Sequence, residues 1–140
     1  MLRIFVLAVF ILLFALLSAC GSPSPSLLGT QCQWATVTTG IAQEPIQNPK
    51  NYVLIFHEDG NFNGQADCNM ISGTYEMDES ALTLSIGPTT LAECGHDSLH
   101  EGFMGFLKYV ERYELKDTRK TLFLSDGSTR LGFKNGGTAE

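Results

Sequence analysis

Short segments rich in β-branched and aromatic residues, separated by turn-forming residues, most constrain what this chain can fold into. One segment alternates strictly, so Leu82, Leu84 and Ile86 share a face that we expect in the core. Asp59-Gly60 and Asp126-Gly127 each stand between two such segments, where an Asp-Gly pair indicates a hairpin turn. The strands we expect cover residues 34–39, 52–56, 62–68, 73–77, 81–86, 112–115, 121–124 and 130–133.

One segment changes from strand-like to helical spacing. Its apolar residues recur at the spacing of one helix face: Leu99, Phe103, Phe106, Leu107 and Val110. Ser98, with Glu101 three residues later, predicts a capping box at the start of this helix. Its two glycines each weaken it by roughly 1 kcal/mol, so tertiary packing should hold it. We expect its aromatic stripe to be core and not a ligand-binding box.

These elements predict an α+β, mainly β fold with about eight antiparallel strands. Closing such a sheet removes its exposed edges. We therefore expect a small curved or partly closed barrel with one helix packed across an opening.

The N-terminal segment is typical of a bacterial lipoprotein signal. Arg3 precedes an apolar run from Ile4 to Leu17, which is shorter than the roughly 20 residues of a membrane span. Leu17-Ser18-Ala19-Cys20 resembles a lipobox, in which cleavage precedes a cysteine that becomes lipidated. We predict a signal peptide over residues 1–19, lipidation at Cys20, and a Ser/Pro spacer that completes residues 20–26.

The remaining chain divides into a domain at residues 27–134 and a flexible tail at 135–140. The whole chain carries a formal net charge of −6, and loss of Arg3 makes the mature protein one unit more acidic. This acidity argues against nucleic acid as a partner and against a basic face that binds an anionic bilayer. Membrane attachment would come from the acyl chains.

The segment Ala66 to Tyr75 resembles the Cys-Asn-x-x-x-Gly-x-Tyr motif of META-domain proteins, the group that includes HslJ. Further parts of the domain match in order: Leu28-Gly29-Thr30, Trp34, Tyr52 to Phe56 with Asp59-Gly60, and Thr89 to Cys94. One departure is Cys32, where relatives often carry Trp. The resemblance implies curved antiparallel strands with one helix, and envelope proteins linked loosely to heat stress, drug tolerance or motility. It implies no catalytic residue.

Once Cys20 is lipidated, three cysteines remain for an oxidising compartment. Cys68 and Cys94 lie inside the two family motifs, and we expect a disulfide between them, although the sequence also permits pairing through Cys32. If Cys68 and Cys94 pair, Cys32 is left over. It would then be a buried inert thiol, an intermolecular disulfide partner or a reactive thiol.

Two segments superficially resemble metal sites. Residues 59–64 copy the first half of an EF-hand loop, but Met70 stands where the bidentate Glu belongs, so we expect a polar turn. His96 and His100 lie four residues apart, but His96 precedes the predicted helix and Cys94 is expected in a disulfide. We predict neither metal nor other cofactor.

No catalytic site is predicted. Ser128 lies in a hairpin turn, and the pairs Glu58-Asp59 and Asp78-Glu79 are expected at solvated turns. We expect a lipid-anchored, non-enzymatic domain of the cell envelope, facing the periplasm or the exterior, that binds an envelope protein or supports the envelope under stress. The alternatives are an inhibitor of a cell-wall hydrolase or protease, and a carrier of a small apolar ligand.

Overall fold

The computed structural model describes residues 27–116 and 121–139. The predicted signal peptide, the lipidation site at Cys20 and the spacer lie outside the described residues. The strands are β1 (Thr30–Thr39), β2 (Ala42–Pro45), β3 (Tyr52–Phe56), β4 (Asn61–Ala66), β5 (Asn69–Asp78), β6 (Ala81–Thr89), β7 (Arg112–Lys116), β8 (Thr121–Ser125) and β9 (Thr129–Thr138). The helices are the 3₁₀ turn η2 (Pro49–Asn51) and α2 (His100–Leu107).

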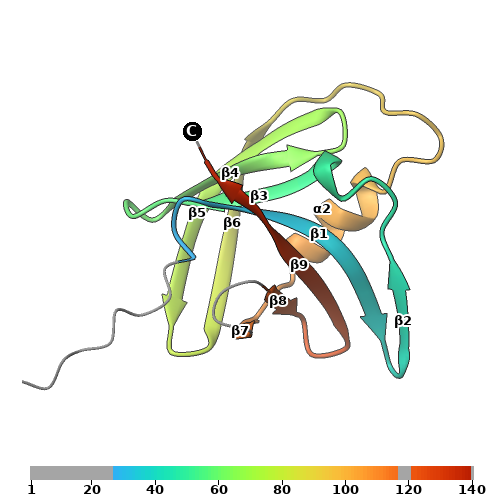
Figure 1. Ribbon diagram of the computed structural model, residues 1–140. Coiled ribbons are helices and arrows are strands. Elements are labelled where there is room, and N and C mark those ends of the chain that lie inside the picture. Colours follow the sequence, from blue (N-terminus) through green and yellow to red (C-terminus); the bar gives the residue numbers. More distant parts are fainter. Residues whose placement is uncertain (1–26, 117–120, 140) are drawn as a thin grey trace, which may run out of the picture.

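The nine strands form one sheet that closes in a ring (Figure 1). The order is β2-β1-β3-β4-β5-β6-β7-β8-β9, and β1 also pairs with β9. Eight of these strands make the ring, while β2 lies beside the second half of β1, where Thr36 to Thr39 pair with Ala42 to Pro45. The mainly β, antiparallel and curved fold predicted from the sequence is confirmed.

The ring is weakest between β6 and β7. Only Ala81 and Arg112 are paired there, whereas β8 and β9 share five paired positions. Two backbone hydrogen bonds extend this junction, from Leu82 N to Glu111 O and from Tyr113 N to Ser80 O. The sheet is therefore closed by a narrow contact on this side.

Helix α2 packs its apolar stripe into the ring. Phe103 is fully buried, and its ring centroid lies 5.2 Å from that of Trp34 and 5.6 Å from that of Tyr52. The alternating face of β6 is in the same core, with Leu82 and Leu84 buried. The prediction that Phe103 and Phe106 are core residues is confirmed. Because these side chains fill the interior, the ring gives no support to carriage of an apolar ligand there.

The predicted start of the helix is wrong in detail. Leu99 is the N-cap residue, and no side-chain hydrogen bond caps the helix. Ser98 lies one residue too early for a capping box, and its Oγ accepts a hydrogen bond from the His100 N–H instead. Leu99 is 40% exposed, so it is the one member of the predicted stripe that leaves the core. Within the described residues, no helix is both long and apolar enough to cross a membrane.

Several strand bounds differ from the prediction: β1 and β5 begin four residues earlier, β6 ends three residues later, and β4 ends at Ala66 because residues 67–68 form a turn. The whole of β2 and the end of β9 were not predicted. β2 has four exposed residues and lacks the alternation that marks a half-buried strand. β9 continues to Thr138, so the expected flexible tail is wrong for residues 135–138. The Gly-rich sequence there is held by backbone pairing with β1, because Cys32 pairs with Asn135 and Thr30 pairs with Thr138.

Candidate functional site

The candidate site is an open cavity of about 620 Å³ at one end of the ring, which we call the loop cleft. It lies between the segment around η2 and the long loop that connects β6 to α2 (Figure 1). Its lining residues are Gln47, Asn48, Asn51, Tyr52, Asp67, Gly95, His96, Asp97, Ser98 and Leu99. Polar side chains from three separate segments therefore surround one opening.

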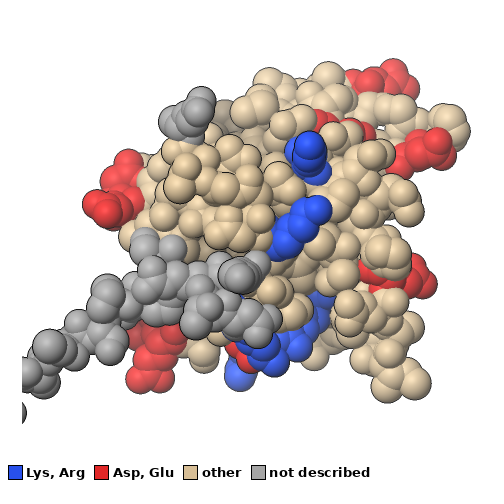
Figure 2. All heavy atoms as spheres, in the orientation of Figure 1, with Lys and Arg blue, Asp and Glu red and all other residues tan. Residues whose placement is uncertain are grey.

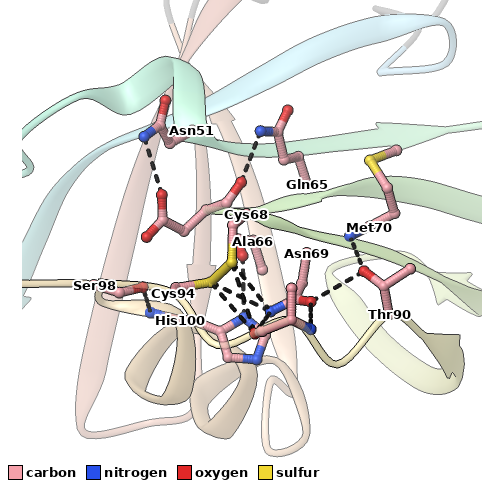
Figure 3. The surroundings of a disulfide bond; sticks show 12 residues. Asn51, Gln65, Ala66, Cys68, Asn69, Met70, Thr90, Cys94, Ser98 and His100 are labelled. Atoms are coloured by element: carbon pink, nitrogen blue, oxygen red, sulfur yellow. Dashed lines mark hydrogen bonds between the residues drawn. A yellow bond between two sulfur atoms is a disulfide. The ribbon is translucent and has the colours of Figure 1, made fainter. Parts of the chain in front are cut away.

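Asn69, at the start of β5, organises the long loop through hydrogen bonds (Figure 3). Its Oδ1 accepts hydrogen bonds from Ala92 N at 2.7 Å and from Thr90 Oγ1 at 3.0 Å. Its Nδ2 donates to Ala92 O at 3.0 Å and contacts Cys94 Sγ at 3.3 Å. Because Asn69 is only 1% exposed, these bonds form away from competing water. The Asn of the family motif thus shapes the loop and takes no part in an open site.

A disulfide joins Cys68 to Cys94, with their Cα atoms 5.7 Å apart (Figure 3). The predicted pairing is therefore present. The bridge ties the turn between β4 and β5 to the loop, so it acts on the same segment as Asn69. Cys68 is exposed, and the bridge lies at the surface of the molecule.

The walls of the loop cleft are joined by further hydrogen bonds. Leu99 N donates to the hydroxyl of the buried Tyr52 at 2.8 Å, which fixes the end of the long loop against β3. Asn51 Nδ2 donates to Asp67 Oδ1 at 3.1 Å, which joins η2 to the β4–β5 turn. A contact of 3.0 Å between His100 Nδ1 and Ala66 O holds the first residue of α2 to β4. The cleft is therefore a preformed surface.

The remaining motif residues also have structural roles. A Cβ atom at Gly73 would lie 2.2 Å from Ser85 O and 2.7 Å from the Phe62 ring, so β5 and β6 approach too closely for any other residue. The Tyr75 hydroxyl donates to His57 O at 2.5 Å and so holds the β3–β4 turn. The motif that carries the family resemblance is a folding motif.

The suspected metal-like segments are surface features. The His96 and Asp97 side chains are 93% and 92% exposed, and His96 Nε2 lies 3.2 Å from Asp97 Oδ1. Within the described residues, no three His, Cys, Asp or Glu side chains are placed to hold a metal ion. Asp59 occupies a turn between β3 and β4, as predicted, and hydrogen bonds from Asn61 lower the pKa of its carboxyl.

Cys32 is the unpaired cysteine of the described residues, and it lies in the core beside β3 and β9. It is 3% exposed, and burial raises the pKa of its thiol from 9.0 to about 12. Since a thiolate is the reactive form, this environment favours an inert thiol over a reactive one.

The role of Asn69 was missed in the sequence analysis. The sequence clue to this role was the position of Asn69 directly after the motif residue Cys68. The clue was not sufficient, because the hydrogen-bond partners of Asn69 lie more than twenty residues further along the chain. A second cavity, of about 400 Å³, was also missed. It adjoins the other side of the same loop and shares Gly95, His96 and Ser98 with the loop cleft. The loop therefore contributes residues to two neighbouring surface cavities.

A closed antiparallel ring with helix α2 packed against it and a disulfide-held loop defines a small, mainly β domain with a preformed surface. The chain belongs to the META domain family, whose pattern matches residues 27–136. No curated protein matches it.

Solved structures show the same fold at low sequence identity. A protein from Burkholderia xenovorans is 14% identical, with a TM-score of 0.61 over 79% of this chain and 83% of its own. A DUF4847 family protein from Bacteroides vulgatus is 14% identical, with a TM-score of 0.62 over 81% of this chain and 96% of its own. These neighbours establish the architecture alone.

Proposed function

We propose that this chain is a lipid-anchored, non-enzymatic binding domain of the bacterial cell envelope. The observation that carries the proposal is the fixed loop between the two cavities. Asn69 and the Cys68–Cys94 bridge hold this loop in place, while the Leu91 side chain on the loop is 89% exposed. A rigid loop that presents an apolar side chain can bind a partner without a large ordering cost.

The chemistry of the described residues supports a role without catalysis. The candidate nucleophile Ser128 donates its hydroxyl to Asp126 Oδ1 at 3.0 Å within a hairpin turn. Asp126 also accepts the N–H groups of Ser128 and Thr129, so this carboxylate stabilises the turn. Although burial acts to raise its pKa, these hydrogen bonds hold the pKa below its usual range. Such a carboxylate is a poor general base at neutral pH.

The lipobox-like sequence at Cys20 and the Ser/Pro spacer support anchoring by acyl chains. The binding role would then be exercised close to a membrane surface, during heat or other envelope stress. An envelope protein is the expected partner.

A photo-crosslinking experiment tests the binding role. A photoreactive amino acid replaces Leu91 in the full chain, and cells are irradiated with and without heat stress. The matched control replaces Ile41, which is fully exposed and apolar at the tip of the β1–β2 hairpin, at the other end of the molecule (Figure 1). A discrete adduct from Leu91 that is absent from Ile41 supports the proposal. Equal adducts from both positions, or none from Leu91, contradict it.

Anchoring is tested separately by cell fractionation. The full chain should appear in the membrane fraction and the Cys20→Ser variant should not. A Cys20→Ser variant that stays in the membrane fraction would contradict lipid anchoring without affecting the test of the loop.

Inhibition of a cell-wall hydrolase is the second candidate. It is favoured by the fixed, projecting loop together with the formal net charge of −6, because opposite charge speeds encounter with a basic enzyme. The test adds excess purified protein to lysozymes and periplasmic proteases. Unchanged hydrolysis rates would remove this candidate.

A further inference from the structure

The fold gathers basic side chains on one face of an acidic protein. Strand register places them on the outer surface of β7, β8 and β9, because Tyr113, Leu115, Leu131 and Phe133 on the same strands point into the core. We call this surface the basic face. Its charged members are Arg112, Glu114, Lys116, Arg130 and Lys134. Figure 2 shows basic side chains down the middle of the view and acidic ones at its margins.

Among the residues that the structure describes, four positive charges on the basic face are offset by a single carboxylate. Glu114 forms ion pairs with both Lys116 and Arg130. Arg112 and Lys134 are exposed and have no acidic partner among the residues that the structure describes. The nearby Asp126 directs Oδ1 to backbone N–H groups of its own turn. The face therefore keeps an excess of positive charge.

The centre of the face is closely packed around Gly132 and Phe123. Gly132 on β9 leaves room for the Phe123 ring of β8 and the Thr36 hydroxyl of β1, since a Cβ at Gly132 would lie 3.1 Å and 2.3 Å from them. The Arg130 guanidinium covers the Phe123 ring at 3.8 Å from its centroid, with Lys116 Nζ at 5.8 Å. This packing holds the cations in place above the sheet.

The opposite side of the ring differs in charge. β5 lies four strands away from β9 in either direction around the ring. Its outward positions include Glu76 and Asp78, which are both exposed. The charges are therefore separated across the molecule, a feature that the whole-chain net charge conceals. A molecule whose charges are separated in this way is oriented by a charged surface such as a membrane.

We propose that the basic face docks on the anionic lipid headgroups of the membrane that holds the acyl anchor. This inference rests on the proposed lipid anchoring. The seven residue steps from Cys20 to Leu27 reach at most about 25 Å. The chain enters the domain just before β1, whose first residue, Thr30, pairs with Thr138 of β9, four residues beyond Lys134. The anchor therefore leads to the end of β9 next to the basic face. A short tether keeps this face close to the headgroups, where each basic residue is attracted over about 10 Å.

The test measures which face lies nearest the bilayer. The full lipidated chain is reconstituted in vesicles that contain a nitroxide-headgroup lipid, with or without phosphatidylglycerol. A dye is attached at Thr121→Cys, between Lys116 and Lys134, or at the control Thr74→Cys on the outer side of β5. The dye should attach only at the new cysteine, since Cys32 is buried and Cys68 is bridged.

Quenching at Thr121→Cys should exceed quenching at Thr74→Cys several-fold in vesicles that contain phosphatidylglycerol. It should fall when salt rises from about 0.1 to about 1 M, which shortens the screening length from about 10 to about 3 Å. Equal quenching at both positions, or the same pattern in neutral vesicles, overturns the proposal. Concentration-dependent quenching that follows self-association would instead assign the face to a second copy of the chain, and would also overturn it.

A charge-matched pair of variants isolates the basic face. Lys134→Gln should lower the docked population roughly fivefold, as expected for one basic residue near an anionic surface. Lys108→Gln removes the same charge beyond the end of α2 and should leave quenching unchanged. Equal effects of the two variants overturn the proposal. Flotation with neutral vesicles reports the anchor alone, so failure of lipid anchoring is distinguished from failure of docking.

Discussion

At the residue scale, Asn69 is the side chain on which the shape of the loop cleft most depends. We predict that Asn69→Ala lowers the free energy of unfolding by about 1–3 kcal/mol, because it removes several hydrogen bonds of a buried amide that each contribute about 0.5–1.5 kcal/mol. The partner groups lie on the exposed residues Thr90 and Ala92, so water can replace part of what is lost. The groups affected are Ala92 N, Ala92 O and Thr90 Oγ1. Urea unfolding measures the loss, and hydrogen exchange should show faster exchange at the Ala92 amide.

Met70→Ala is the control for this prediction. Met70 follows Asn69 in β5 and is 54% exposed, and its contacts with Thr90 are made by backbone atoms. Its replacement should change stability by less than about 0.5 kcal/mol. An Asn69→Ala variant that is as stable as Met70→Ala would show that Asn69 does not organise the loop.

Cys32 gives a second prediction at this scale. The folded protein should resist thiol reagents at neutral pH, and Cys32 should react in denaturant, because the thiol is 3% exposed and burial raises its pKa. The pKa is higher in the folded state, so the unfolded chain loses its proton first. Stability should therefore fall as pH rises from 9.0 toward about 12. A Cys32→Ala variant should show a smaller loss over the same range, which alkaline unfolding curves measure.

At the element scale, the parts that could be predicted are those in which local pattern and final packing agree. The Leu82, Leu84 and Ile86 alternation and the Phe103 stripe are of this kind, since each presents one apolar face to one core. β2 and the end of β9 could not be predicted. Their residues carry no such pattern, and it is the backbone of β1 that makes them strands.

Helix α2 supplies a prediction about glycine. Nothing lies within 4 Å of a Cβ atom built at Gly102 or Gly105. Alanine should therefore stabilise the folded protein by about 0.5–1 kcal/mol at each position, through higher helix propensity and a less flexible unfolded chain. Thermal unfolding of the Gly102→Ala/Gly105→Ala variant measures the gain.

Gly64→Ala should have the opposite effect on the stability of the folded protein. A Cβ atom at Gly64 in β4 would lie 2.0 Å from Val53 O of β3, so the strands would have to separate. This variant should be destabilised or fail to fold. If all three glycines responded alike, the packing described for α2 would be wrong.

At the scale of the whole molecule, the sequence predicted the disulfide through the family motif but not the charge separation. Composition gives only the total charge, and the expectation that no basic face binds an anionic bilayer followed from that total. The basic face arises because residues at every second position of β7 and β9 share the outer side of a closed sheet. The candidate site was hidden for a similar reason, since its walls come from segments that only the fold brings together.

The Cys68–Cys94 bridge yields the prediction that belongs to this scale. It spans 26 residues and encloses the β5–β6 hairpin. In the chain-entropy account, its loss should lower the free energy of unfolding by about 3.5 kcal/mol. Guanidinium unfolding of the Cys68→Ser/Cys94→Ser variant measures this change. Reductant should destabilise the native protein in the same way and leave the variant unaffected, which separates the bridge from other effects of reduction.

The bridge also distinguishes the two proposed binding surfaces. It restrains the loop beside Asn69, whereas the strands of the basic face are paired with one another and with β1, without any contact through the bridge. In the Cys68→Ser/Cys94→Ser variant, crosslinking from Leu91 should therefore fall, while quenching at Thr121→Cys should persist in anionic vesicles. Both signals are measured at a temperature where circular dichroism shows the variant folded. Loss of both together would mean that the loop and the basic face are one surface.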